Sequence, residues 1–166
     1  VPGAVEHTVE FSSFSKTFNM AGWRLGAAVG SAEALSNLLS IKSNMDSGHF
    51  KSVYDAGVAA IDTIDRDWIN DRNKIYQERR DAIISVLPEI GLKASTPSAA
   101  LYIWAEVVDG NGDDYARDAL EIAHVSMAPG SAYGPSGKNF VRMSLCTPVE
   151  RIQEGVERLK AWRNQS

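Results

Sequence analysis

Residues 12–26 of this chain are Ser12-Ser13-Phe14-Ser15-Lys16-Thr17-Phe18-Asn19-Met20-Ala21-Gly22-Trp23-Arg24-Leu25-Gly26. A lysine follows closely spaced hydroxyl side chains, and an arginine comes eight residues after that lysine. Apolar residues flank the stretch, with Val9 and Phe11 before it and the run 25–29 after it. The pattern predicts a strand, a polar loop and a second, buried strand over 25–30.

Three side chains of this loop suit one anion. The hydroxyls of Ser13 and Ser15 can donate hydrogen bonds, and the guanidinium of Arg24 offers a rigid fork of N–H donors that matches a phosphate. Lys16 lies among them, where neighbouring positive charge and partial desolvation favour a free amine that can attack a carbonyl. A phosphate anchor beside a nucleophilic lysine is what a pyridoxal phosphate site needs. The alternative is an ordinary strand-end lysine with turn serines and a solvated arginine.

The stretch resembles the lysine motif of the class I/II aminotransferases, which are fold-type-I pyridoxal phosphate enzymes. Ser13-Phe14-Ser15-Lys16 and Gly22-Trp23-Arg24-Leu25-Gly26 fit that motif at every position. The resemblance implies that Lys16 is the catalytic residue and holds the cofactor, pyridoxal 5'-phosphate, covalently. It implies that Ser13, Ser15 and Arg24 also bind the cofactor. The fold it implies is α/β, namely the C-terminal part of such a transferase with the end of the large domain and the small α+β domain.

The composition is that of an ordinary globular protein, with 44% apolar and 23% charged residues. A net charge of -4 argues against a surface for nucleic acid or for an anionic membrane. The single cysteine, Cys146, excludes an internal disulfide, and three scattered histidines lack ligand spacing, so we expect no metal. No apolar run approaches the roughly 18 residues of a membrane span, and the first residues have no signal-peptide pattern. A cytoplasmic protein is therefore expected.

Enzymes of the resembling family are more than twice as long as this chain. We therefore expect the C-terminal part of a longer enzyme, with residues 1–78 closing the cofactor-binding large domain and 79–166 forming the small domain. A long amphipathic helix of about residues 65–87 would cross that boundary, because apolar residues recur every three or four positions until Pro88 and Gly91. Further helices are expected over 31–42 with Ser31 as N-cap, over 51–63 as a buried helix, and over 114–124.

The loop 43–50 is polar and contains Asn44, Asp46 and Ser47. In the resembling enzymes this loop lies near the subunit interface and the cofactor of the neighbouring protomer. A capped connection between two helices explains it at least as well, because Asp and Ser favour turns.

A β-rich run over 100–107 predicts a strand. It resembles the family's strand beside the substrate, which makes Tyr102 a candidate substrate contact, although a half-buried strand tyrosine is the commoner case. The Pro-Gly segment at 129–134 resembles the family's Pro-Gly-x-x-Phe/Tyr-Gly segment near the substrate entrance.

Alternation over 139–145 predicts another strand, with Arg142 on the face opposite Val141 and Met143. In the resembling enzymes the arginine at this position binds the α-carboxylate of the substrate. A bidentate guanidinium suits that task because it fixes a carboxylate in place and in register. A solvated strand arginine is the alternative.

The resemblance implies an aminotransferase that acts on an amino acid and a 2-oxo acid. Among subfamilies it is most similar to the LL-diaminopimelate aminotransferases, with the aspartate and alanine enzymes as close rivals. It also implies a homodimer of the full-length protein. Several usual parts of the cofactor site are expected upstream, so residues 1–166 alone should give no useful turnover. Three alternatives stay open: a carbon–sulfur lyase or decarboxylase on the same scaffold, a non-catalytic regulator behind a DNA-binding domain, and a plain phosphate-binding domain.

Overall fold

The computed structural model describes residues 1–165, which divide into two compact units, 1–66 and 67–165. The division falls at the first turn of helix α4 (Arg66–Ile84). The expected boundary at residue 78 lies within the same helix, and the assignment of the two units to a large and a small domain stays a prediction. In the part of the chain that is described, no helix is long and apolar enough to cross a membrane.

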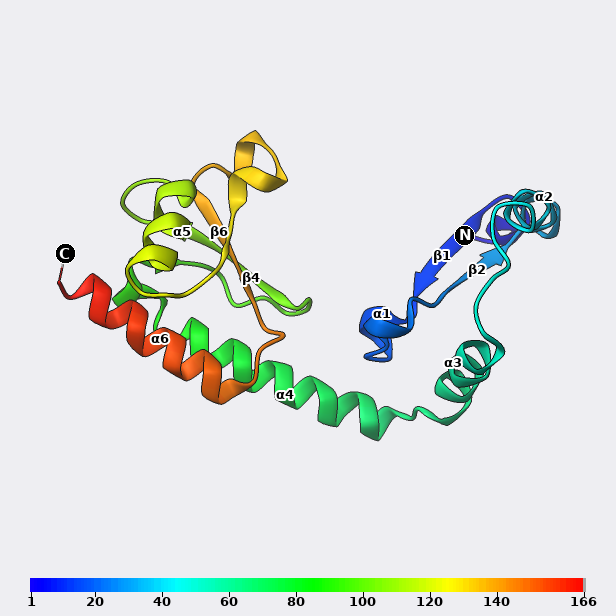
Figure 1. The fold of residues 1–166 in the computed structure, drawn as a ribbon, viewed down its shortest axis with the longest axis horizontal. Coiled ribbons are helices and arrows are strands. Elements are labelled where there is room, and N and C mark those ends of the chain that lie inside the picture. Colours follow the sequence, from blue (N-terminus) through cyan, green and yellow to red (C-terminus); the bar gives the residue numbers. More distant parts are fainter. Residues whose placement is uncertain (166) are drawn as a thin grey trace. The chain divides into compact units, whose positions relative to one another are not determined.

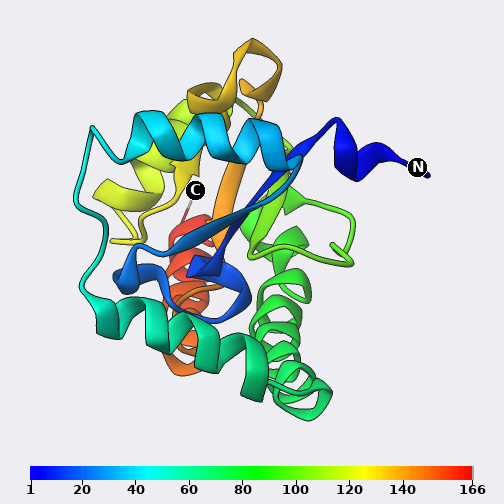
Figure 2. The same cartoon turned by 90° about the vertical axis from the view of Figure 1, so that its right-hand side faces the viewer.

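The first unit is built on an antiparallel hairpin (Figure 1). Its elements are η1 (Ala4–Glu6), β1 (Val9–Ser13), α1 (Phe14–Thr17), η2 (Ala21–Trp23), β2 (Gly26–Gly30), α2 (Ala32–Lys42) and α3 (Lys51–Thr63). Strands β1 and β2 pair from Val9 with Gly30 to Ser13 with Gly26. Both views show α3 beside the loop end of the hairpin and α2 at its other end (Figures 1 and 2).

The expected strands and helices of this unit are confirmed, but their expected burial is wrong. Helix α2 begins after Ser31, whose hydroxyl accepts a hydrogen bond from the amide of Ala34 at 3.4 Å. By contrast, Gly57 is the one buried residue of α3 among those described, and β2 has none. The reason is the size of the unit, because a two-stranded sheet with a few helices encloses little volume.

The second unit is a four-stranded antiparallel sheet with helices. Its elements are α4 (Arg66–Ile84), η3 (Leu87–Ile90), β3 (Leu92–Lys93), β4 (Tyr102–Val107), α5 (Gly112–Glu121), β5 (Ala128–Pro129), η4 (Gly130–Tyr133), η5 (Pro135–Gly137), β6 (Phe140–Ser144) and α6 (Val149–Arg163). The strand order is β3-β4-β6-β5. The long helix is three residues shorter at its end than expected, since η3 takes over before Gly91.

The two central strands separate an apolar face from a polar one. Their buried side chains are Ile103, Ala105, Val107, Val141 and Met143. These side chains join buried residues of α4, α5 and α6 in one hydrophobic cluster, so the three helices cover that face of the sheet. The intervening residues Tyr102, Trp104 and Arg142 lie on the other face, because successive side chains of a strand alternate. The expected face of Arg142 is thereby confirmed.

Helix α5 begins in close contact with β6. The amide of Gly112 donates a hydrogen bond to the carbonyl of Lys138 at 2.8 Å. A methyl group at Gly112 would overlap the carbonyl oxygen of Phe140. Only glycine therefore lets the helix start at this distance from the strand.

We predict opposite effects of alanine at two glycines of this unit. Gly112→Ala should lower the free energy of unfolding by about 1–3 kcal/mol, because the helix must move away from Phe140. Gly155→Ala, inside α6, should raise it by about 0.5–1 kcal/mol, because the new methyl group meets only Val125 at 3.8 Å and alanine favours a helix. Urea unfolding followed by circular dichroism measures both, and equal effects would contradict the packing argument.

Tyr115 of α5 links this helix to η3 inside the core. Its hydroxyl donates a hydrogen bond to the carbonyl of Ile90 at 2.7 Å, and its ring meets Trp162 edge-on with centroids 5.2 Å apart. Burial raises the pKa of Tyr115 above the ordinary value of a tyrosine. A raised pKa in the folded state means that the neutral hydroxyl stabilises the fold below about pH 10, and that this contribution declines as the pH rises further.

Tyr115→Phe should lower the free energy of unfolding by about 1–2 kcal/mol at neutral pH, because the carbonyl of Ile90 loses its donor. The difference from the wild type should shrink above about pH 10, because ionisation of this tyrosine lowers the free energy of the unfolded wild-type chain. Urea titrations at pH 7 and at about pH 10.5 test both statements. A difference that stays constant across that range would show that Tyr115 does not titrate as described.

Candidate active site

The strand ladder of the first unit closes the loop that carries Lys16. Ser13 pairs with Gly26 at the end of the ladder, and the amide of Phe14 donates to the carbonyl of Leu25 at 3.1 Å. Residues 14–25 therefore start and finish at the same end of the hairpin. This closure brings Ser13 and Arg24 together, although they lie eleven residues apart in the sequence.

A small apolar cluster supports the loop from one side. It consists of Phe14, Met20 and Leu25, which are buried, with Phe18 and three residues of α3 packed against them. The rings of Phe14 and Phe18 lie 4.9 Å apart. Gly57 of α3 faces Leu25, and a larger residue there would collide with that leucine. The apolar residues of the motif thus anchor the loop while its polar residues stay exposed.

Arg24 has an unusual backbone conformation. Its φ is 54° and its ψ is 37°, in the left-handed region that a non-glycine residue enters at a cost of roughly 1 kcal/mol. The guanidinium donates one hydrogen bond through Nη1 to the carbonyl of Ala21 at 3.0 Å, which folds the side chain over its own turn. The remaining N–H groups of Arg24 form no hydrogen bond among the described residues.

Ser13 is the last residue of β1, and Ser15 and Lys16 follow it in the short helix α1. The hydroxyl oxygen of Ser13 caps α1 by accepting from the amide of Ser15 at 3.2 Å, which leaves its proton free to donate. Lys16 forms no ion pair within residues 1–165. Because it is exposed, the first unit does not supply the partial desolvation that was expected for it. The segment 11–32 has no acidic residue, which makes the loop a concentration of positive charge in an acidic chain.

The candidate residues of the second unit lie together on the polar face of the sheet. Arg142 of β6 is partly buried, and its guanidinium carbon lies 4.2 Å from the ring centre of Tyr102 on β4. The ring centre of Tyr133 lies 4.6 Å from the same carbon. In the described chain the guanidinium donates no hydrogen bond to protein. It is therefore held by aromatic faces, with its N–H donors available to a ligand.

Tyr133 is a contact that the sequence-based prediction missed. Its segment was expected near the substrate entrance, but the tyrosine was not singled out. The sequence feature that could have identified it is its position in Pro129-Gly130-Ser131-Ala132-Tyr133-Gly134, where an aromatic residue follows a sharp turn.

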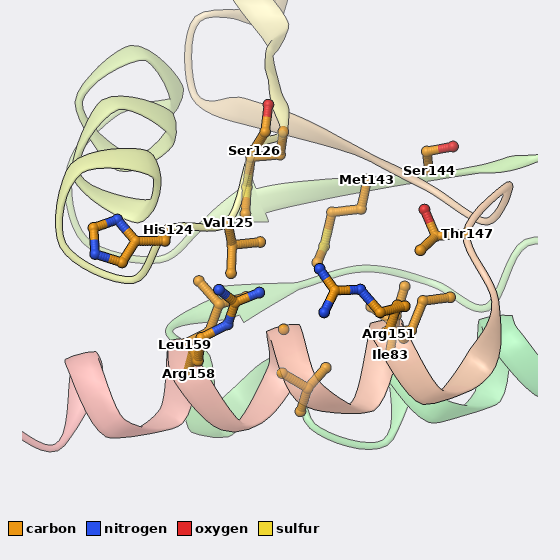
Figure 3. A pocket seen from close by; sticks show the side chains of 14 residues that line it. Ile83, His124, Val125, Ser126, Met143, Ser144, Thr147, Arg151, Arg158 and Leu159 are labelled. Atoms are coloured by element: carbon orange, nitrogen blue, oxygen red, sulfur yellow. The ribbon is translucent and has the colours of Figure 1, made fainter.

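A separate hollow of about 190 Å³ lies on the helix side of the second unit (Figure 3). Its lining includes the apolar residues Ile83, Met143 and Leu159 and the basic residues Arg151 and Arg158. None of the six predicted cofactor or substrate residues lines it. Since Met143 faces the helices and Arg142 the opposite side, this hollow is not the expected carboxylate site.

The loop 43–50 uses its acidic residue within its own structure. Asp46 accepts from Lys42 at 2.7 Å and from the amide of Gly48 at 2.8 Å, and these hydrogen bonds hold the pKa of its carboxyl below the ordinary range. The hydroxyl of Tyr54 accepts from the amide of His49 at 2.9 Å. These contacts fit the explanation of the loop as a capped helix connection, and a role near a partner subunit stays a prediction.

Comparisons with known proteins cover nearly the whole chain. The sequence profile of the family "Aminotransferase class I and II" matches residues 3–159. An LL-diaminopimelate aminotransferase of Syntrophobacter fumaroxidans is 42% identical over 161 residues, which are 96% of this chain and 41% of that enzyme. The chain thus spans about two fifths of the length of the curated relatives it matches.

Two solved structures show the same fold. A probable N-succinyldiaminopimelate aminotransferase from Thermus thermophilus matches with a TM-score of 0.85 and 34% identity, over 97% of this chain and 43% of its own. The aspartate aminotransferase of Rhizobium meliloti matches with a TM-score of 0.88 and 29% identity, over 99% of this chain and 44% of its own.

The apolar support of the lysine loop yields a prediction. Phe14→Ala should expose residues 14–25 to trypsin, which cleaves after Lys16 and Arg24, because loss of a buried ring weakens the cluster that holds the loop. Phe11→Ala is the matched control, since Phe11 is 71% exposed on the adjoining strand. Mass spectrometry of the early fragments should show faster cuts at both sites in the first variant only. Equal rates in both variants would mean that the cluster does not order the loop.

Proposed function

Because the chain belongs to the class I and II aminotransferase family, we propose that it supplies the lysine-bearing part of an enzyme that moves an amino group from an amino acid to a 2-oxo acid. The cofactor would be pyridoxal 5'-phosphate. The observation that carries this proposal is the closed loop 14–25, in which one end of the hairpin carries Lys16 together with the exposed residues Ser13 and Arg24 and the half-buried Ser15.

The donor set of this loop fits the phosphate of that cofactor. Two serine hydroxyls and a guanidinium with free N–H groups can together satisfy a dianionic phosphate. The positive charges of Lys16 and Arg24 favour an anion on electrostatic grounds, because the segment 11–32 contains no acidic residue. The left-handed backbone conformation of Arg24 contributes to this donor set. Its guanidinium lies back over the loop, where it donates to the carbonyl of Ala21, and does not extend along the strand.

The chemistry divides between the cofactor and the chain. When bound, pyridoxal phosphate withdraws electrons from the carbon that carries the substrate's amino group. Nζ of Lys16 would hold the cofactor until the substrate's amine replaces it, and would then carry the proton from the substrate's α-carbon to the cofactor. Arg142 would bind the α-carboxylate through parallel N–H donors, beside the ring of Tyr102.

The proposed substrates are an amino acid such as LL-diaminopimelate, aspartate or alanine, together with a 2-oxo acid. The first choice rests on relatives that are named LL-diaminopimelate aminotransferases, at 38–42% identity. A homodimer of a protein of full family length is part of the same proposal. Residues 1–166 alone should give no useful turnover, because the relatives are more than twice as long.

The decisive test labels the lysine. A chain of full family length that ends in these 166 residues is incubated with pyridoxal phosphate, reduced with borohydride and mapped by peptide mass. The label should lie on the peptide of Lys16 and be absent from Lys16→Ala. Lys42→Ala is the matched control and should keep the label, since Lys42 is exposed and paired with Asp46.

Label elsewhere, or label that survives in Lys16→Ala, would sink the covalent role of Lys16. An assay for transamination then separates the reaction types. Release of pyruvate or ammonia without a 2-oxo acid would indicate a lyase on the same scaffold.

A further inference from the structure

The guanidinium of Arg142 is held by aromatic rings from two different segments. Tyr102 belongs to the neighbouring strand β4, whereas Tyr133 belongs to the turn η4. The rings lie 4.2 and 4.6 Å from the guanidinium carbon. A ring face attracts the positive charge of the guanidinium, and this contact leaves the N–H groups in the plane of the guanidinium free to donate hydrogen bonds.

Tyr133 is 51% exposed, but its ring is in contact with other aromatic residues. Trp104 meets its ring edge-on with centroids 5.7 Å apart, and Trp104 itself stacks on Phe140 at 5.4 Å. Trp104 is also the direct partner of Arg142 across the β4–β6 ladder. The tyrosine, the tryptophan and the arginine therefore form one continuous contact on the polar face of the sheet.

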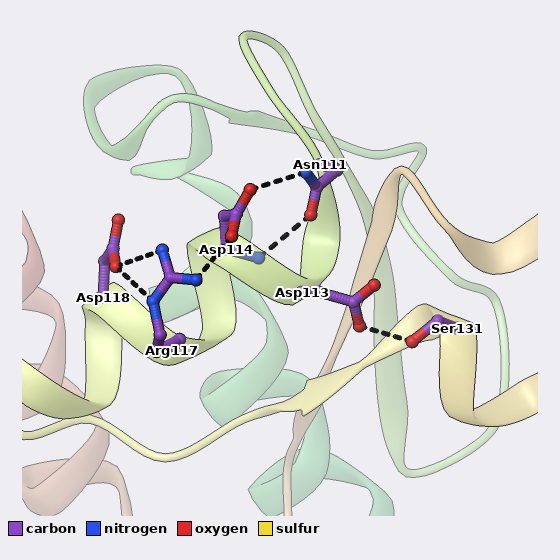
Figure 4. Close-up of polar contacts among 6 residues, drawn as sticks. All are labelled: Asn111, Asp113, Asp114, Arg117, Asp118 and Ser131. Atoms are coloured by element: carbon purple, nitrogen blue, oxygen red, sulfur yellow. Dashed lines mark hydrogen bonds and ion pairs between the residues drawn. The ribbon is translucent and has the colours of Figure 1, made fainter.

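The turn that carries Tyr133 is fixed at its base. Gly130 and Gly137 approach so closely that a side chain on either would overlap the carbonyl oxygen of the other. The hydroxyl of Ser131 donates to the carboxylate of Asp113 at the first turn of α5 (Figure 4). The segment thus holds the ring of Tyr133 at a set position two residues beyond Ser131.

We propose that Tyr133 is a positioning residue for substrate-carboxylate binding by Arg142. This inference rests on the proposed role of Arg142 and adds the group that orients it. A long arginine side chain loses much conformational freedom when it grips a carboxylate. A ring that already holds the guanidinium reduces that loss, so the carboxylate is bound more tightly by a preorganised fork.

The kinetic test uses the enzyme of full family length that ends in these 166 residues. Tyr133→Leu should raise the KM of the amino-acid substrate about two- to fivefold, while kcat stays within about twofold, because binding and not the chemical step is affected. Tyr133→Phe keeps the aromatic face and should retain the wild-type KM within about twofold.

A fluorine series keeps the test valid even if Tyr133→Leu fails to fold. Phenylalanines with one, two and three ring fluorines at position 133 keep the shape of the ring but weaken the negative charge of its face. KM should climb stepwise along this series. A KM that stays level across the series would overturn the proposal.

A second readout does not depend on activity. In the 166-residue chain, the Nε–H proton of Arg142 should resonate upfield because it lies against ring faces, and Arg142→Lys assigns the signal by removing it. Tyr133→Phe should keep the upfield position, and Tyr133→Leu should move the signal toward that of a solvated arginine. A signal that Tyr133→Leu does not move would overturn the proposal.

The two proposals fail in different ways. If Arg142→Lys leaves KM unchanged, the carboxylate role of Arg142 is wrong, and the role of Tyr133 falls with it. If Arg142→Lys raises KM but neither Tyr133→Leu nor the fluorine series does, Arg142 binds the carboxylate without help from Tyr133.

Discussion

The register between β4 and β6 is the constraint on which the second unit depends. Trp104 lies opposite Arg142, and Ala105 lies opposite Val141. With this register the apolar residues of both strands face the helices, and Arg142 faces the other way. A slip by one residue would turn Arg142 toward the hydrophobic cluster, where an unpaired cation would cost several kcal/mol. Burial of the apolar residues of β4 and β6 therefore both stabilises the fold and keeps Arg142 on the opposite face of the sheet.

The lysine loop of the first unit follows a comparable logic at a smaller scale. Phe14 and Leu25 point into the apolar cluster, and their neighbours Ser13, Ser15 and Arg24 are left outside it. The backbone pays a conformational cost at Arg24, which the strand ladder and the buried leucine next to it offset. The proposed ligand-binding residues and the buried anchoring residues thus alternate along one short segment.

The local distribution of charge is compatible with the proposed anionic ligands, although the chain as a whole is acidic. The net charge is -4, yet the segment 11–32 has only basic charges. Arg142 is likewise surrounded by rings rather than by carboxylates. Both proposed ligand groups, a phosphate and a carboxylate, would meet a cation whose charge is not already neutralised by the protein. Membership of the aminotransferase family is consistent with this distribution of charge.

The sequence by itself determined the family motif, helices α2 to α6, strands β1, β2, β4 and β6, and the outward face of Arg142, but not the two-residue strands β3 and β5. Each of these depends on spacing within a short segment. The spacings are the small residues around Lys16, the recurrence of apolar residues every second position in strands and every three or four positions in helices, and the alternation over 139–145. The burial of α3 was predicted wrongly. Apolar residues on a helix show which face can pack against other elements, but not how much protein the unit has to bury that face. Tyr133 was missed as a partner of Arg142, because the two meet only after β5 pairs with β6 and the Gly130–Gly137 contact folds the turn back. Contacts between segments are decided by the tertiary structure, since their free energy depends on distances that no local pattern contains.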